Sequence, residues 1–164
     1  MDLAACLLRE LEAEERTTRR VLERVPPDKL DWKPHARSMT LGGLAQHVAA
    51  TPGAIARSSI PDAYPVESFS PDPQPSGVAQ ILKAHEDSMK EARAVLAALD
   101  DARAAAQWSM TMGGQPILTL TRLEWIRTYM LNHWIHHRGQ LSVYLRELNV
   151  PVPAMYGPSA DENN

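Results

Sequence analysis

Apolar residues recur every three or four positions over four long stretches of the chain, which is the spacing of one buried helix face. In the first stretch Glu12 and Arg16 also lie four residues apart, the separation at which helical side chains pair. The pattern predicts helices over residues 2–23, 41–56, 77–99 and 121–148. Four helices of this length favour an all-α fold, a four-helix bundle.

Several residues that begin or interrupt helices set the expected boundaries. Ser38 or Thr40 can cap the second helix, and Ser76 can cap the third. Pro52 falls inside the second helix, so we expect that helix to kink or restart there. The residues from Thr121 to Glu124 have the spacing of a capping box, which predicts where the last helix begins.

The remaining segments show no helical period. Residues 58–75 hold five prolines and predict a long surface crossover between the second and third helices, which could also act as a lid. Around Gly113 and Gly114, two short runs could pair as a hairpin, and no other strand signal is strong. The tail beyond Leu148 should pack its first half on the bundle and fray at its acidic end. We expect a single domain over residues 1–164.

Composition excludes several classes of protein. Hydrophobic residues make up 44% and charged residues 23%, as in ordinary globular chains. The net charge of -3 and the scattered positive residues argue against a nucleic-acid partner. The chain has neither an apolar run long enough for a membrane span nor a basic-then-apolar leader at its start, so we expect a cytoplasmic protein. The one cysteine, Cys6, forms no disulfide within the chain, and a buried structural thiol is favoured over a nucleophile.

His133 and His137 carry the strongest chemical signal. They lie four residues apart on the predicted last helix, inside its apolar stripe. A buried imidazole without a partner costs about 1–3 kcal/mol, and a metal ion shared by the two rings removes that cost. The same spacing occurs in the HExxH helix of zinc proteases, but Trp134 stands where their glutamate would be. That protease mechanism is therefore not expected.

A third ligand must come from another helix, because two side chains seldom hold a catalytic ion. His47 lies at the border of the apolar stripe of the second helix, where it could face the pair. Three neutral imidazoles suit one divalent metal ion, zinc or nickel first, with iron or manganese possible. The alternative is that these histidines only form hydrogen bonds in the core.

The other histidines have more than one interpretation. His136 flanks the stripe and should be a group behind the ligands or a surface residue. His85 lies at the centre of the apolar face of the third helix; it could be a fourth ligand or a proton shuttle, but a hydrogen-bonded core histidine is favoured. His35 could line the mouth of the site or be a solvated loop residue.

Three further polar residues of the last helix are candidates for the surroundings of the site. Arg138 and Gln140 could bind polar groups of a substrate or cap a neighbouring loop. Tyr144 falls at nearly the same angle around the helix as His133, which makes it a candidate pocket residue.

Four sequence segments together resemble the DinB-like family of bacterial four-helix-bundle proteins: WKPHARSMT, SMTLGGLAQHVA, TRLEWIRTYMLNHWIHHRGQL and the tail VPVPAMYGPS. The resemblance covers nearly the whole chain and implies a bundle with a long crossover, a three-histidine metal site and, commonly, a homodimer. His47, His133 and His137 each occupy a matching position, so the resemblance implies a ligand role for all three.

The resemblance also narrows the function. The family includes or adjoins metal-dependent enzymes that use low-molecular-weight thiols, such as mycothiol or bacillithiol, as S-transferases or isomerases. We expect a metal-dependent enzyme on a small molecule, thiol transfer first and hydrolysis second. The competing hypothesis is a non-catalytic structural or stress-response protein that binds metal. A closed four-ligand site would favour the latter, and an open three-histidine site facing a pocket would favour catalysis.

Overall fold

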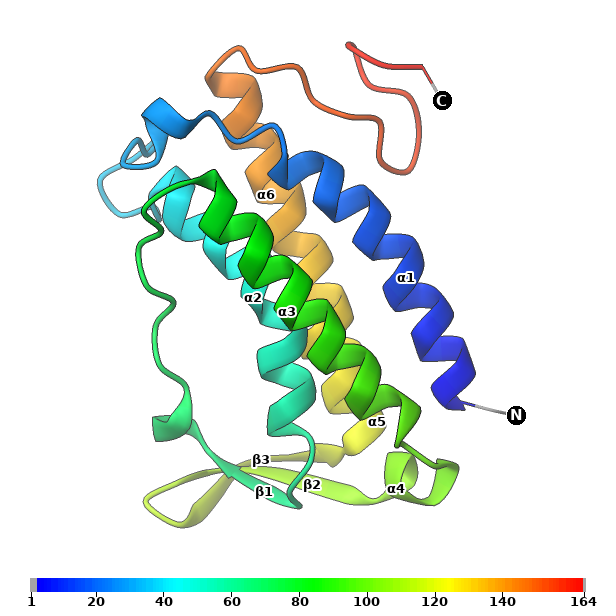
Figure 1. Ribbon diagram of the computed structural model, residues 1–164. Helices are drawn as coiled ribbons and strands as arrows, with labels where there is room; N and C mark the ends of the chain where they lie inside the picture. The colour runs from blue at the N-terminus through cyan, green and yellow to red at the C-terminus, as the bar shows by residue number, and fades with distance from the viewer. Residues whose placement is uncertain (1–2, 164) are drawn as a thin grey trace.

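Four long helices pack together along most of their length in the computed structural model, which describes residues 3–163 (Figure 1). Helix α2 contacts both α3 and α6, and α1 contacts the same two helices from the other side. The predicted mainly helical fold is confirmed. No helix formed by residues 3–163 is long and apolar enough to cross a membrane. The long helices are α1 (Leu3–Leu22), α2 (Leu41–Ser58), α3 (Val78–Ala97) and α6 (His133–Glu147).

The apolar stripes read from the sequence form the core between these helices. Leu11 of α1, Leu44 of α2 and Leu141 of α6 are all fully buried or nearly so. Thr40 caps α2, because its hydroxyl accepts a hydrogen bond from the Gly43 N–H at 3.0 Å. One of the two expected caps of α2 is thereby confirmed.

Helix α2 continues through Pro52 to Ser58, so it does not restart at the proline. Proline has no N–H, which leaves the carbonyl four residues earlier, that of Val48, without its helical donor. The indole N–H of Trp134 on α6 donates to this carbonyl at 2.8 Å. Helix α6 thus supplies the donor that α2 lacks.

A three-stranded sheet of order β1-β2-β3 lies at one end of the helices (Figure 1). The predicted hairpin is confirmed: β2 and β3 pair antiparallel, and Gly113 and Gly114 turn the chain with φ of +54° and +79°, which favour glycine. Strand β1 in the crossover was not predicted; its three residues include a proline, and it pairs parallel to β2. The strands are β1 (Ala63–Pro65), β2 (Gln107–Met112) and β3 (Gln115–Thr121), with short helix α4 (Asp101–Ala105) before β2.

The last helix begins where the capping box predicted, but it is not one regular helix. Thr121 and Glu124 cap α5 (Arg122–Trp125) reciprocally. A π-helical segment, Ile126–Asn132, then joins α5 to α6, and the His133 N–H donates five residues back to the Thr128 carbonyl. The predicted continuous helix is therefore interrupted by a π segment directly before the first of the two histidines.

Two local expectations were wrong, one about the cap of α3 and one about the burial of Cys6 on α1. Ser76 does not cap α3: Gly77 holds that position without a side-chain hydrogen bond, and Ser76 donates instead to the Gln80 side chain. Cys6 is half-buried on α1 and accepts a hydrogen bond from the Arg9 guanidinium at 3.2 Å, so it is not the fully buried thiol expected.

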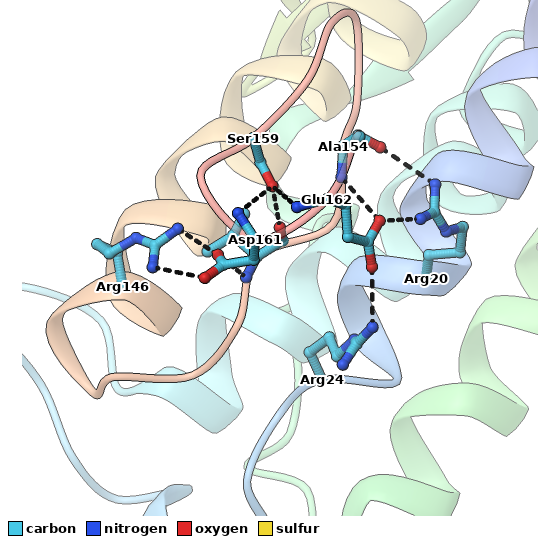
Figure 2. A network of polar contacts seen from close by, with 8 residues as sticks. Arg20, Arg24, Arg146, Ala154, Ser159, Asp161 and Glu162 are labelled. Atoms are coloured by element: carbon cyan, nitrogen blue, oxygen red, sulfur yellow. Dashed lines mark hydrogen bonds and ion pairs between the residues drawn. The ribbon is translucent and has the colours of Figure 1, made fainter. Parts of the chain in front are cut away.

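The tail after α6 folds back over α1 and α6, and its acidic end is tied down instead of fraying (Figure 2). Asp161 accepts from Arg146 at 2.5 Å and from the Val152 N–H at 2.9 Å. Glu162 forms ion pairs with Arg20 and Arg24. These contacts fasten the end of the tail to α6 and to the C-terminal end of α1.

Candidate metal centre

His47, His133 and His137 meet where α2 packs against α6. One ring nitrogen from each lies within 4.8 Å of those of the other two. The ring centroids of His133 and His137 are 4.4 Å apart, and that of His47 lies 4.7 Å from His137 and 5.3 Å from His133. Two helices thus bring together the three residues singled out in the sequence.

The closest contact in the group joins the Nε2 atoms of His133 and His137, which are 2.8 Å apart. Two unprotonated nitrogens at this distance repel each other through their lone pairs, so the pair needs a proton or a cation between them. Nitrogens that share a tetrahedral zinc at about 2.0–2.1 Å lie about 3.4 Å apart. A small displacement of the rings would accommodate such an ion.

Two of the three rings are oriented by hydrogen bonds on their far side. The Nδ1 of His47 lies 2.8 Å from a carboxylate oxygen of Asp72, and the Nδ1 of His137 lies 2.7 Å from the Oε1 atom of Gln140. Because both partners accept, each Nδ1 carries the proton and each Nε2 keeps its lone pair. Metal-binding histidines are oriented in this way.

The surroundings keep the α6 histidines neutral. Burial, reinforced by the positive charge that His137 and His47 would carry, lowers the pKa of His133 to about 4. Burial also lowers the pKa of His137. Neutral imidazole is the form that binds metal, so near pH 7 both residues are ready to act as ligands without first losing a proton.

A cavity of about 440 Å³ opens beside the centre. His47, His133 and Asp72 form its polar side, and the remaining wall is mostly carbon, from residues that include Phe69 and Trp125. A small molecule in this cavity could therefore reach an ion held by the histidines.

The DinB family model matches residues 1–164, the whole chain. The chain belongs to the DinB family. It is 26% identical over 157 residues to the uncharacterized protein YrdA of Bacillus subtilis (strain 168), which covers 94% of this chain and 89% of YrdA.

Solved structures with the same fold include two bacilli proteins described as DinB-like. The Bacillus subtilis protein YjoA superposes with a TM-score of 0.72 at 19% identity, over 91% of this chain and 96% of that one. The Bacillus cereus ATCC 10987 protein has a TM-score of 0.72 at 21% identity, over 92% and 95% of the two chains. At these identities the likeness establishes the fold of this DinB-family protein.

Two residues that support the centre were not assigned that role in the sequence. Asp72 lies in the proline-rich crossover, and no local pattern distinguishes it from the other acidic residues there. Gln140 was considered for substrate binding or loop capping, whereas it holds His137 from three residues along the same helix. The three-residue spacing was a signal that could have found Gln140.

His85 and His136 do not join the ligand group. His85 is buried on α3 with its ring centroid 6.2 Å from that of Trp134, and it is absent from the cluster of ring nitrogens within residues 3–163. His85 is a core residue, as expected, with backbone groups of Glu15 and Ala49 near its ring, although neither ring nitrogen forms a hydrogen bond of normal geometry within residues 3–163. His136 is exposed, with its ring 5.0 Å from that of His137, which fits the surface interpretation.

Two other candidates form structural contacts away from the centre. Arg138 points towards α1, where it pairs with the Glu14 carboxylate at 2.6 Å and donates to Thr18, so it is not a pocket residue. Tyr144 packs edge-on against Trp32 and donates weakly to the Met39 carbonyl; it does not line the cavity.

His35 is exposed in the loop before α2. Its Nδ1 accepts a hydrogen bond from the Arg37 N–H at 3.1 Å. It does not line the cavity beside the centre, so the solvated-loop interpretation holds.

Proposed function

We propose that this protein is a metal-dependent enzyme that acts on a small molecule, with one divalent ion held by His47, His133 and His137. The observation that carries the proposal is the convergence of three imidazoles beside a cavity that two of them line. The metal-binding character of DinB-like proteins supports the same assignment.

The donor set indicates the kind of ion and chemistry. Three imidazole nitrogens suit zinc or nickel, with iron or manganese as alternatives. Three protein ligands leave a coordination position for substrate or water, as in catalytic zinc sites. When bound, such an ion lowers the pKa of a thiol or water and makes it a nucleophile near neutral pH. Transfer of a low-molecular-weight thiol is the first choice of reaction, and hydrolysis is the second.

The protein's own residues would position the centre. Asp72 holds the proton on His47 Nδ1, and Gln140 does the same for His137. Both contacts fix the ring orientation and direct Nε2 away from the supporting residue. Asp72 also lines the cavity, so its carboxylate lies on the side from which a substrate would approach.

The alternative is a non-catalytic protein in which the ion only stabilises the packing of the helices. A closed site with four protein ligands would favour this alternative. Within residues 3–163, no fourth histidine, cysteine or carboxylate joins the group of three. His85, the residue considered for that role, is not part of it. The open arrangement supports the catalytic proposal.

Elemental analysis of the purified protein, with His137→Ala and its neighbour His136→Ala as a matched pair, tests the metal assignment. We expect about one equivalent of a divalent metal in the wild type and in His136→Ala, and loss of that metal in His137→Ala, because two ligands seldom retain an ion. Equal metal content in both variants would exclude His137 as a ligand.

Asp72 gives a second test. Asp72→Ala should weaken zinc binding by about 10–100-fold in a chelator competition assay, because His47 loses the partner that orients it. Asp28→Ala, which removes an exposed carboxylate from the short 3-10 helix Pro27–Lys29, should bind zinc as the wild type does. An unchanged affinity in Asp72→Ala would show that the Asp72 contact does not support the centre.

A further inference from the structure

The cavity beside the histidines is lined mainly by carbon, and this property restricts what it can bind. Its wall combines aromatic rings with aliphatic side chains from α2, the crossover, β2 and the segment before α6. The large side chains with apolar surface in this wall are Met39, Ile55, Phe69, Met110, Trp125 and Tyr129.

The aromatic part of the wall is rigid. Trp125 stacks on Trp108 with ring centroids 4.0 Å apart, and its indole N–H donates to the Ser58 hydroxyl at 3.0 Å. Tyr129 lies against the same indole, with centroids 4.3 Å apart, and Phe69 approaches it from the crossover at 6.4 Å. Such a preformed aromatic surface favours flat apolar molecules.

The polar groups in the wall offer little to a charged ligand. Among residues 3–163, no lysine or arginine lines the cavity, and Asp72 is its single carboxylate. The Thr51 hydroxyl already donates to the His47 carbonyl at 2.6 Å. Ser70 and Tyr129 add hydroxyls but no positive charge, so an anionic group away from the histidines would lose its hydration without gaining a cation, which is costly.

A neighbouring cavity that shares part of this wall is more polar. Phe69, Ser70 and Asp72 also line a cavity of about 390 Å³. Its remaining wall includes Arg57 and Glu91, which pair with each other at 2.7 Å. The protein therefore has a polar cavity next to the apolar one, and only the apolar one includes the histidines.

From these contacts we infer that the cavity takes a small, uncharged, mainly aromatic molecule that presents one polar atom to the histidines. The inference rests on the proposed function, because it identifies the substrate class of the same site. In a thiol transfer, this molecule would be the electrophile: the thiolate sulfur would form a bond to its electrophilic carbon, and a leaving group on that carbon would depart with the electron pair of the broken bond. The body of the molecule would lie between Phe69, Met110 and the indole of Trp125.

Two fluorescent probes that differ by one charged group test this inference. N-phenylnaphthylamine is neutral, and anilinonaphthalenesulfonate adds a sulfonate to nearly the same ring system. In the metal-free protein we expect the neutral probe to bind roughly tenfold more tightly or better, because the sulfonate finds no cation in the wall. Titrations with both metal-free and zinc-loaded protein separate this preference from the metal assignment.

Variants locate the binding and reduce the preference for the neutral probe. Phe69→Ala should weaken binding of the neutral probe, and Met39→Lys should narrow the difference between the probes by placing a cation in the wall. Met39 is 42% exposed, so this change should leave the fold intact. Ile117→Lys, at a residue 51% exposed on β3 and outside the cavity, is the matched control and should change neither affinity.

The results distinguish this inference from the proposed function. Equal or tighter binding of the sulfonated probe to the metal-free wild type would overturn the inference. A preference for the neutral probe that neither Phe69→Ala nor Met39→Lys alters would also overturn it. If the protein binds the neutral probe but cannot be loaded with zinc, the inference is supported and the proposed function is refuted.

Discussion

His85 is buried and His133 is half-buried, and their surroundings give them different roles. His133 has His137 as a close partner, whereas His85 is 1% exposed and neither of its ring nitrogens forms a hydrogen bond within residues 3–163. Burial and the charge of Arg19 lower the pKa of His85 to about 4, although backbone groups of Glu15 and Ala49 oppose the shift without hydrogen bonds of normal geometry. His85 is therefore neutral in the folded protein at pH 7.

The lowered pKa makes His85 a source of acid lability. An unfolded chain takes up a proton on His85 near pH 6.5, but the folded protein does so only near pH 4. The contribution of neutral His85 to the free energy of unfolding is therefore fully present above pH 6.5 and is lost as the pH falls towards 4. His85→Leu should be at least as stable as the wild type at pH 7 and should lose about 2 kcal/mol less on going to pH 5.

Denaturant unfolding at the two pH values measures the effect of His85→Leu. His136→Leu, at an exposed position, is the control and should keep the pH dependence of the wild type. If His85→Leu loses as much stability as the wild type between pH 7 and pH 5, another group carries the acid sensitivity.

Residue-scale reasoning from the sequence was sufficient for the pair on α6, because a four-residue spacing places two side chains on one helix face regardless of the rest of the fold. It failed for Tyr144. Tyr144 shares the angle of His133 around the helix but lies eleven residues further, about 16 Å along the axis. An angle on a helix says nothing of height, so Tyr144 contacts Trp32 instead.

At the scale of elements, α2 and the segment before α6 both depart from regular helical hydrogen bonding close to the histidines. Pro52 leaves the Val48 carbonyl to Trp134, one residue after His133. The π segment ends at Asn132, directly before His133. The alignment of α2 with α6, and with it the distance between His47 and the other two, therefore depends on contacts between helices.

A double-mutant cycle tests the bond between these elements. Trp134→Phe leaves the buried Val48 carbonyl without a donor, which costs about 1–3 kcal/mol in addition to the lost packing. Pro52→Ala restores an N–H within α2 that can donate to the same carbonyl. The free energy lost on Trp134→Phe should therefore be about 1 kcal/mol smaller in the Pro52→Ala background, as measured by denaturant unfolding.

The cycle cancels the packing loss, because Trp134→Phe removes the same ring volume in both backgrounds. Equal costs in the two backgrounds would show that the Trp134 indole N–H does not replace the missing donor of Pro52.

At the scale of the whole molecule, the tail links α6 to the C-terminal end of α1 through ion pairs. Asp161 and Glu162 accept from arginines of α6 and α1 and also from the N–H groups of Val152 and Ala154. The tail therefore forms a closed loop held by its own acidic end (Figure 2).

Replacing both carboxylates should release the tail without unfolding the bundle. In the double variant Asp161→Ala with Glu162→Ala, hydrogen exchange at the Val152 and Ala154 amides should become at least about tenfold faster. The unfolding midpoint should change little, because exposed ion pairs contribute little to global stability. Unchanged exchange at both amides would show that the acidic end does not hold the tail.

A control for the tail variant is the pair Glu12→Ala with Asp28→Ala. Both residues are exposed carboxylates outside the tail. Exchange at Val152 and Ala154 should match the wild type in this control, which removes the same number of negative charges.

Helix positions, the hairpin turn and the two neighbouring histidines of α6 were all determined by the sequence alone, because each depends on residues within a few positions of one another. Apolar spacing predicts a helix, Gly113 and Gly114 supply the positive φ values of a turn, and His133 with His137 needs only one helical turn.

Only the tertiary structure decided which distant groups meet these local features. The contact of Asp72 with His47 spans 25 residues, and the bond of Trp134 to Val48 spans 86. No local pattern encodes such pairings, because they arise from how whole helices and the crossover pack. The ligand pair could thus be found from its spacing, whereas its supporting carboxylate and the cavity beside it depended on the assembled fold.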